Sequence, residues 1–153
     1  MQQDTTDAHN LQRFVLAQQP AYATALSELK AGRKRTHWIW FVFPQVEGLG
    51  HSEMSKRYSI RSAAEALAYL AHPVLGTRLA ECTRAVLAVA DRSPNEIFGS
   101  PDDLKFRSSL TLFDAVDAGG IYRRGLDQFF QGERDPATLA VLDRWRAEDA
   151  SSA

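Results

Sequence analysis

The sequence predicts an all-α protein: a single compact domain of about six to eight helices with at most one short extended segment. Apolar residues recur at helical spacing through most of the chain. Residues that start helices (serine, aspartate, proline) and glycines that end them flank these segments. A length of 153 residues suits one domain with a substantial core, expected over residues 10–148.

The first two predicted helices precede a basic segment. Residues 11–18 have helical apolar spacing, and Asn10 is a candidate N-cap because its side chain can accept an unpaired backbone N–H. Pro20 is placed to open a second helix, where its missing N–H costs nothing, and Gly32 is placed to end it. Residues 1–9 are polar and acidic and are expected to form a disordered tail.

The apolar run 38–43 has no polar face, so periodicity alone does not decide between a buried strand and a helical or extended segment. Pro44 disfavours the helical conformation at Phe43, so a helix here should end at that point. Residues 46–60 are rich in glycine and serine and predict a long connection. Connections of this length are uncommon in compact domains and are often functional.

The second half of the chain predicts helices in close succession. Ser62 with Glu65 has the spacing of a capping box. The predicted helices are one after Ser62, one with a strong apolar stripe from Pro73 to Val89, a short turn from Ser93-Pro94 to Gly99, one opened by residues 100–103 that runs through Val116, one from Ile121 to Phe130 ended by Gly132, and a last one opened by Asp135-Pro136. Residues 149–153 are small and polar and are expected to fray.

Composition excludes several classes of protein. Hydrophobic residues make up 44% and charged residues 24%, and the net charge of −1 gives no strong nucleic-acid signal. No apolar run approaches the ~20 residues of a membrane span, and the N-terminus lacks a signal-peptide pattern. A single cysteine, Cys82, allows no intrachain disulfide. We therefore expect a soluble cytoplasmic protein without membrane partners.

Residues 33–45 are the most informative segment for function. Arg33, Lys34, Arg35 and His37 precede Trp38, and residues 33–61 carry six Lys or Arg against two Glu, a local charge of +4. Cations for a phosphate beside aromatic faces are what a nucleotide site needs, and base stacking contributes about 1–3 kcal/mol. The alternative interpretation is that the aromatic residues form the core and the cations offset a helix dipole.

Two further segments are polar enough to belong to a site. Residues 102–111 place Asp103, Lys105 and Ser108 on one helix, although serine is a poor helix-interior residue. The carboxylates at its start also satisfy the helix dipole, and a small Ser108 also permits close packing. In the connection, Arg57 next to Lys56 is a candidate phosphate clamp beside Tyr58. The histidines show no metal-ligand spacing, and no cofactor is indicated.

Several segments together resemble a bacterial family of unknown function, DUF1810, whose small all-helical members are often mislabelled calpastatin. The resemblance covers roughly residues 10–145. It rests on GRKRTHWIWFVFPQ at 32–45, GLG at 48–50, MSKRY at 54–58, HPVLG at 72–76, ECT at 81–83, IFGSPDDLK at 97–105 and SSLTLF at 108–113. It implies an all-α domain and no established activity. Calpastatins are long disordered inhibitors, whereas this composition is globular.

Two hypotheses for function follow. In the first, the domain binds or processes a small anionic ligand such as a nucleotide or an ADP-ribose-like molecule. The ligand-binding candidates are Lys34, His37, Trp38, Gln45, Tyr58, Asp103 and Lys105. Asp103 and His37 are also the candidates for proton transfer, because an imidazole titrates near neutral pH. In the second hypothesis, the domain is a non-catalytic interaction module with a structural polar network. Neither predicts a reaction, a ligand identity or an oligomeric state.

Overall fold

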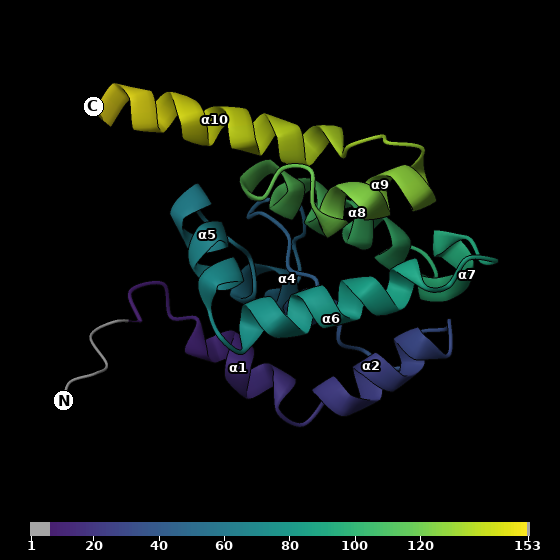
Figure 1. Cartoon of the computed structure of the whole chain (residues 1–153). Coiled ribbons are helices and arrows are strands. Elements are labelled where there is room, and N and C mark those ends of the chain that lie inside the picture. Colours follow the sequence, from purple (N-terminus) through teal and green to yellow (C-terminus); the bar gives the residue numbers. More distant parts are fainter. Residues whose placement is uncertain (1–6, 153) are drawn as a thin grey trace.

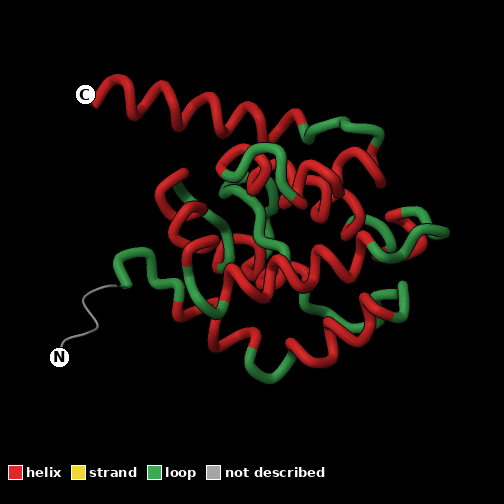
Figure 2. Tube along the Cα trace, in the orientation of Figure 1, coloured by secondary structure: helices red, strands yellow, loops and turns green. Residues whose placement is uncertain are grey.

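Ten helices and no strand occur in residues 7–152, the part of the chain that the computed structural model describes (Figures 1 and 2). The helices are α1 (Gln12–Gln18), α2 (Tyr22–Lys30), α3 (Ile39–Val42), α4 (Glu53–Arg57), α5 (Ala63–Ala71), α6 (Leu75–Leu87), α7 (Pro94–Phe98), α8 (Asp102–Val116), α9 (Ile121–Phe130) and α10 (Pro136–Ser152). The all-α prediction is confirmed, but the predicted number of six to eight helices was too low. Short helices of four and five residues, α3 and α4, account for the difference.

The helices stack in layers around α6 and α8. From bottom to top of Figure 1, α2, α6, the pair α8 and α9, and α10 follow one another. α6 packs against α2, α5 and α9, whereas α8 packs against α5, α7, α9 and α10. The short α3 contacts α1, α6 and α8, which places it at the centre of the domain. No helix within residues 7–152 has the length and apolar character of a membrane span.

Local sequence signals explain most helix boundaries. Gly32 adopts φ of 78°, a conformation that suits glycine, directly after the end of α2. Ser93 and Glu96 form a complete capping box at the start of α7. The backbone turns out of the helical region at Phe43, before Pro44, as predicted. α10 begins at Pro136 and continues through residues 149–152, where the sequence predicts fraying. The sequence predicts a disordered tail at residues 1–9, of which residues 1–6 lie outside the described residues.

One predicted cap and one predicted capping box differ from the structure. Asn10 has φ of 51° and does not cap α1; the carboxylate of Asp7 instead accepts the backbone N–H groups of Leu11 and Gln12. Ser62 does cap α5 by accepting the N–H of Glu65 at 3.0 Å. The Glu65 carboxylate, however, accepts from residues outside α5 rather than completing a capping box. At α1 the carboxylate of Asp7 is therefore the acceptor, whereas at α5 the carboxylate of Glu65 accepts the backbone N–H of Arg61 and a guanidinium N–H of Arg13.

The aromatic run after the basic segment forms the centre of the core. Trp38, Ile39 and Phe43 are each 1% exposed. Phe43 and Phe106 meet edge to face with ring centroids 5.0 Å apart, which joins α3 to α8. The structure thus resolves the open choice at residues 38–43 as a buried single helical turn. Residues 46–60 form a connection that contains α4 and closes with a bridge between Val46 and Ile60.

Candidate functional site

One buried carboxylate, that of Glu28 in α2, holds the segment between α2 and α3. It accepts the backbone N–H groups of Arg35 and Thr36 at 2.9 and 3.1 Å. It also accepts the Thr36 hydroxyl at 2.8 Å and the Trp38 indole N–H at 2.9 Å. Burial alone would raise the pKa of Glu28, but these four hydrogen bonds favour the charged form more and lower its pKa to about 2. The basic segment is thereby fixed to α2.

Trp38 and Lys34, two of the candidate residues, lie inside this arrangement. The indole of Trp38 is buried, so it offers no free face for a ligand base. The Lys34 ammonium lies 5.1 Å from the centroid of that indole and 2.8 Å from Oδ2 of Asp102. The Lys34 side chain is only 6% exposed. Lys34 therefore joins the basic segment to the start of α8 and contributes mainly to structure.

Lys105 reaches the same carboxylate from the next turn of α8. Its ammonium lies 3.7 Å from Oδ1 of Asp102 and 5.3 Å from the Trp40 ring centroid. Asp102 thus lies between two lysines, although the sequence placed Asp103 in the candidate site. The i, i+3 spacing of Asp102 and Lys105 was the available signal. The indole N–H of Trp40 is buried and has no hydrogen-bond partner within the described residues.

A hollow of about 370 Å³ opens beside Lys105, and we call it the α8 cleft. It lies between the connection after α3, one face of α8 and the start of α10. The residues that line it are Gln45, Leu49, Gly50, Pro101, Leu104, Lys105, Ser108, Asp135 and Ala137. Two of the candidate residues, Gln45 and Lys105, therefore face one common space.

A hydrogen-bonded network centred on Asp135 forms the polar side of the α8 cleft. The Ser108 hydroxyl donates to Oδ2 of Asp135 at 2.7 Å, and Thr138 donates its backbone N–H to the same oxygen at 3.2 Å. Oδ1 lies 3.6 Å from the Arg107 guanidinium. Asp135 is 9% exposed, so these contacts fix its position and cap α10. Ser108 therefore belongs to this network.

The remaining candidate residues lie apart from the α8 cleft. Tyr58 is 8% exposed and packs against the rings of Phe14 and Phe41, at 5.7 and 5.5 Å between centroids. His37 is exposed and does not line the cleft. Asp103 accepts the backbone N–H of Leu104 and also does not line it. The seven candidates therefore do not form a single site.

Residues 7–152 offer little support for metal or thiol chemistry. No group of three His, Cys, Asp or Glu side chains in that range is placed to hold a metal ion. Cys82 is buried in α6, and burial raises the pKa of its thiol to about 12. The thiol therefore stays protonated near neutral pH, and the cysteine belongs to the core.

Comparisons with known proteins agree with the fold. The family model described as "Protein of unknown function (DUF1810)" matches residues 8–142. The chain is also similar to the crystal structure of the conserved hypothetical protein Rv1873 from Mycobacterium tuberculosis. The two share 51% sequence identity and a TM-score of 0.88 over 90% of this chain and 99% of that chain. No curated protein matches the sequence.

Proposed function

The chain belongs to the DUF1810 family of proteins of unknown function, and we propose that it binds a small anionic organic ligand in the α8 cleft. The ligand belongs to the nucleotide or ADP-ribose-like class. Gln45 and Lys105 bind its anionic group, and the apolar residues of the cleft contact its organic part. The proposal retains two of the candidate residues and assigns the other five to structure or to other surfaces.

The observation that carries this proposal is that two polar groups in the cleft have free hydrogen-bonding capacity. The side-chain amide of Gln45 makes no hydrogen bond to another residue within residues 7–152, and it lines the cleft. The Lys105 ammonium is 3.7 Å from Asp102, which is a charge contact too long for a hydrogen bond. Its N–H donors therefore remain available. An amide and an ammonium that share a hollow suit a carboxylate or phosphate oxygen.

The dimensions and walls of the cleft favour an organic anion over a bare ion. Its volume of about 370 Å³ lies at the lower end of the range of ligand pockets, which favours the smaller members of the proposed class. Leu49, Leu104 and Pro101 supply apolar surface, and Leu104 is 50% exposed. A ligand that covered Leu104 would bury apolar area as well as pair its charge.

The proposal is one of binding and includes no reaction. His37 and Asp103, the two candidates for proton transfer, do not line the cleft. Asp135 does line it, but Ser108 and Thr138 already donate to its Oδ2. These hydrogen bonds fix the Asp135 carboxylate within the polar network. The site therefore supports recognition.

Thermal unfolding with a panel of nucleotides, NAD and ADP-ribose tests the proposal. A ligand at a hundred times its dissociation constant should add about 2.7 kcal/mol of stability to the wild type. Gln45→Glu keeps the side-chain shape but places a negative charge in the cleft, so the added stability should be lost. Lys105→Ala removes the cation and should weaken it. Lys30→Ala, which removes an exposed lysine at the end of α2, is the matched control.

The result that would contradict the proposal is a wild-type protein that no ligand of the panel stabilises. A ligand whose effect persists in Gln45→Glu would place its binding outside the α8 cleft. The unliganded melting temperature of each variant must be measured first, because a lower starting stability would otherwise resemble lost binding.

A second candidate function is a protein-interaction module, and one surface favours it. A hollow of about 610 Å³ lies between α5, α6 and the start of α9, and Leu67 on its edge is 52% exposed. Exposed apolar surface of this kind often marks an interaction site. Two results together would support this function instead. No anionic ligand would stabilise the wild type, and a partner protein would raise the melting temperature of the wild type but not that of Leu67→Glu.

A further inference from the structure

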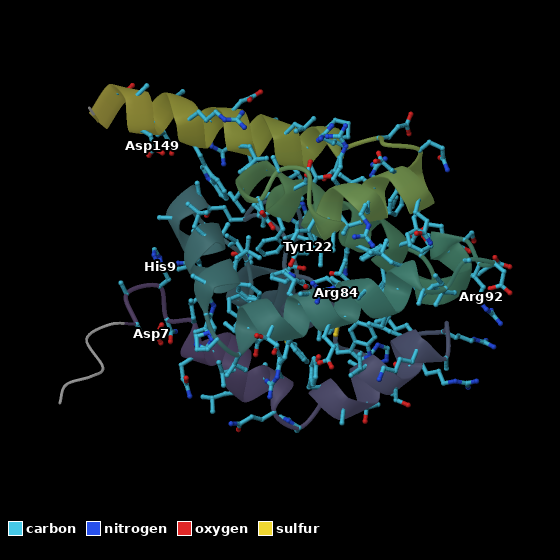
Figure 3. All side chains as sticks on the ribbon, in the orientation of Figure 1. Asp7, His9, Arg84, Arg92, Tyr122 and Asp149 are labelled. Carbon is cyan, nitrogen blue, oxygen red and sulfur yellow. The ribbon has the colours of Figure 1, made fainter. Side chains whose placement is uncertain are left out.

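A second cationic surface surrounds Arg13 of α1, and its lining residues differ from those of the α8 cleft. A hollow of about 470 Å³ lies between the segment before α1, the end of α4 and the start of α5. Arg13, Arg57 and Arg61 line it together with His9, which lies on the segment before α1 (Figure 3). We call it the arginine hollow. It shares no lining residue with the α8 cleft.

Arg13 has a structural role in this hollow, because all N–H donors of its guanidinium already bond to other residues of the chain. Its Nε donates to the carbonyl of Arg57 at 2.8 Å, and its Nη1 donates to the carbonyls of His9 and Asn10. Its Nη2 donates to the carbonyl of Ser59 and to Oε2 of Glu65, at 2.8 and 2.9 Å. A guanidinium has five N–H donors, so none is left for a ligand. Arg13 holds the three walls of the hollow together.

Glu65, the acid that lines the hollow, is fully engaged. Its side chain is 4% exposed, Oε2 pairs with Arg13, and Oε1 accepts the backbone N–H of Arg61 at 2.9 Å. Asp7 is also engaged, by the backbone N–H groups of Leu11 and Gln12. The guanidinium groups of Arg57 and Arg61 make no ion pair within residues 7–152 and are exposed. Among the described residues, the hollow therefore carries two positive charges that have no acid partner.

An apolar shelf adjoins the arginine hollow. A second hollow of about 450 Å³ shares Asn10, Arg13 and Arg57 with it and adds Leu16, Ala17 and Tyr58. Leu16 is 57% exposed, the most exposed of the large hydrophobic side chains within the described residues. A ligand whose anionic end lies between Arg57 and Arg61 would place its next atoms on this shelf.

From these contacts we propose that the arginine hollow is a binding site for a phosphomonoester whose organic part is apolar or aromatic. Arg57 and Arg61 bind the phosphate oxygens, since a guanidinium can form bidentate hydrogen bonds with a phosphate group. The organic group packs on Leu16 beside Tyr58. Uncompensated charge and apolar surface meet at Arg57, which lines both hollows.

Isothermal titration of the full chain with phenyl phosphate, inorganic phosphate and phenol tests this site. Phenyl phosphate should bind several-fold more tightly than inorganic phosphate, and phenol should not bind. In Arg57→Gln/Arg61→Gln, both phosphate compounds should bind about tenfold more weakly or worse, since charge-assisted hydrogen bonds are lost. In Leu16→Ala, phenyl phosphate should bind only as well as inorganic phosphate, whose affinity stays unchanged.

The matched control is Arg124→Gln/Arg144→Gln, which removes the same charge from exposed arginines of α9 and α10. Equal weakening in this control would show a general charge effect and overturn the proposal. Equal affinity of phenyl phosphate and inorganic phosphate would overturn the apolar shelf. Weakening by Gln45→Glu in place of the double arginine variant would show that the probes bind in the α8 cleft, which overturns the second site and supports the proposed function.

Discussion

The α8 cleft and the arginine hollow differ in how their charged groups are balanced. In the cleft, Lys105 faces Asp102, and Asp135 is held by Ser108 and Thr138. In the arginine hollow, the one lining carboxylate is used by Arg13, and two further arginines have no acid partner within residues 7–152. The difference teaches that a dense run of polar residues can indicate an internal network. A charged side chain that lacks a partner of opposite charge can be recognised only from its contacts in the folded structure.

The largest effect is expected at the network that forms the polar side of the cleft. Asp135→Ala should lower the free energy of unfolding by about 3 kcal/mol, because it removes the cap of α10 together with the buried carboxylate that accepts hydrogen bonds from Ser108 and Thr138. Asp135→Asn retains one acceptor oxygen and should cost less. Chemical denaturation measures both, and a loss below about 1 kcal/mol in Asp135→Ala would show that the network is not structural.

Glu28→Gln should cost about 2 kcal/mol at neutral pH, since an amide accepts fewer hydrogen bonds than a carboxylate. The pKa of Glu28 in the folded protein is about 2, below the ordinary value of 4.5. Its charged form therefore stabilises the fold above pH 4.5, and this stabilisation is lost as the pH falls toward 2. The difference in unfolding free energy between wild type and variant should narrow over that range. A difference independent of pH would contradict this account of Glu28.

The two lysines at Asp102 should differ in their effect on stability. Lys34→Ala removes a 6% exposed side chain 2.8 Å from the carboxylate and should cost about 1 to 2 kcal/mol. Lys105→Ala removes a 23% exposed partner at 3.7 Å and should cost less than about 1 kcal/mol. Equal losses would show that Lys105 is as structural as Lys34, which would weaken its assignment to the ligand.

The smallest effect is expected in the arginine hollow. Arg57→Gln/Arg61→Gln should change the unfolding free energy by no more than about 0.5 kcal/mol, because neither guanidinium has an acid partner in the described residues. Thermal unfolding without phosphate measures this change. A loss above about 1 kcal/mol would mean that these arginines stabilise the fold, and the contrast between the two surfaces would disappear.

Local interactions made much of the fold predictable from sequence. Gly32, the Ser93 capping box and Pro136 act within a few residues of the boundaries they set, so their signals can be read along the chain. Residues 38–43 were ambiguous because a single buried helical turn has no polar face. Asn10 was wrong as a cap because the carboxylate of Asp7 competes for the same N–H groups.

The candidate site was less predictable, because its contacts join distant parts of the chain. Lys34 and Asp102 form an ion pair although five helices, α3 to α7, lie between them in the sequence, and no local spacing reveals that pair. Sequence reasoning correctly left open whether Trp38 is core, and its burial decides the question. Gln45 was named as a residue at the edge of the basic-aromatic segment, but only the fold places it in one cleft with Lys105.

The central claim is that the α8 cleft binds an anionic organic ligand through Gln45 and Lys105. It is tested most directly by titrating one stabilising nucleotide of the panel into wild type, Gln45→Glu and Arg57→Gln/Arg61→Gln. The account predicts about tenfold weaker binding or worse in Gln45→Glu and unchanged binding in the double arginine variant. Unchanged binding in Gln45→Glu would contradict it.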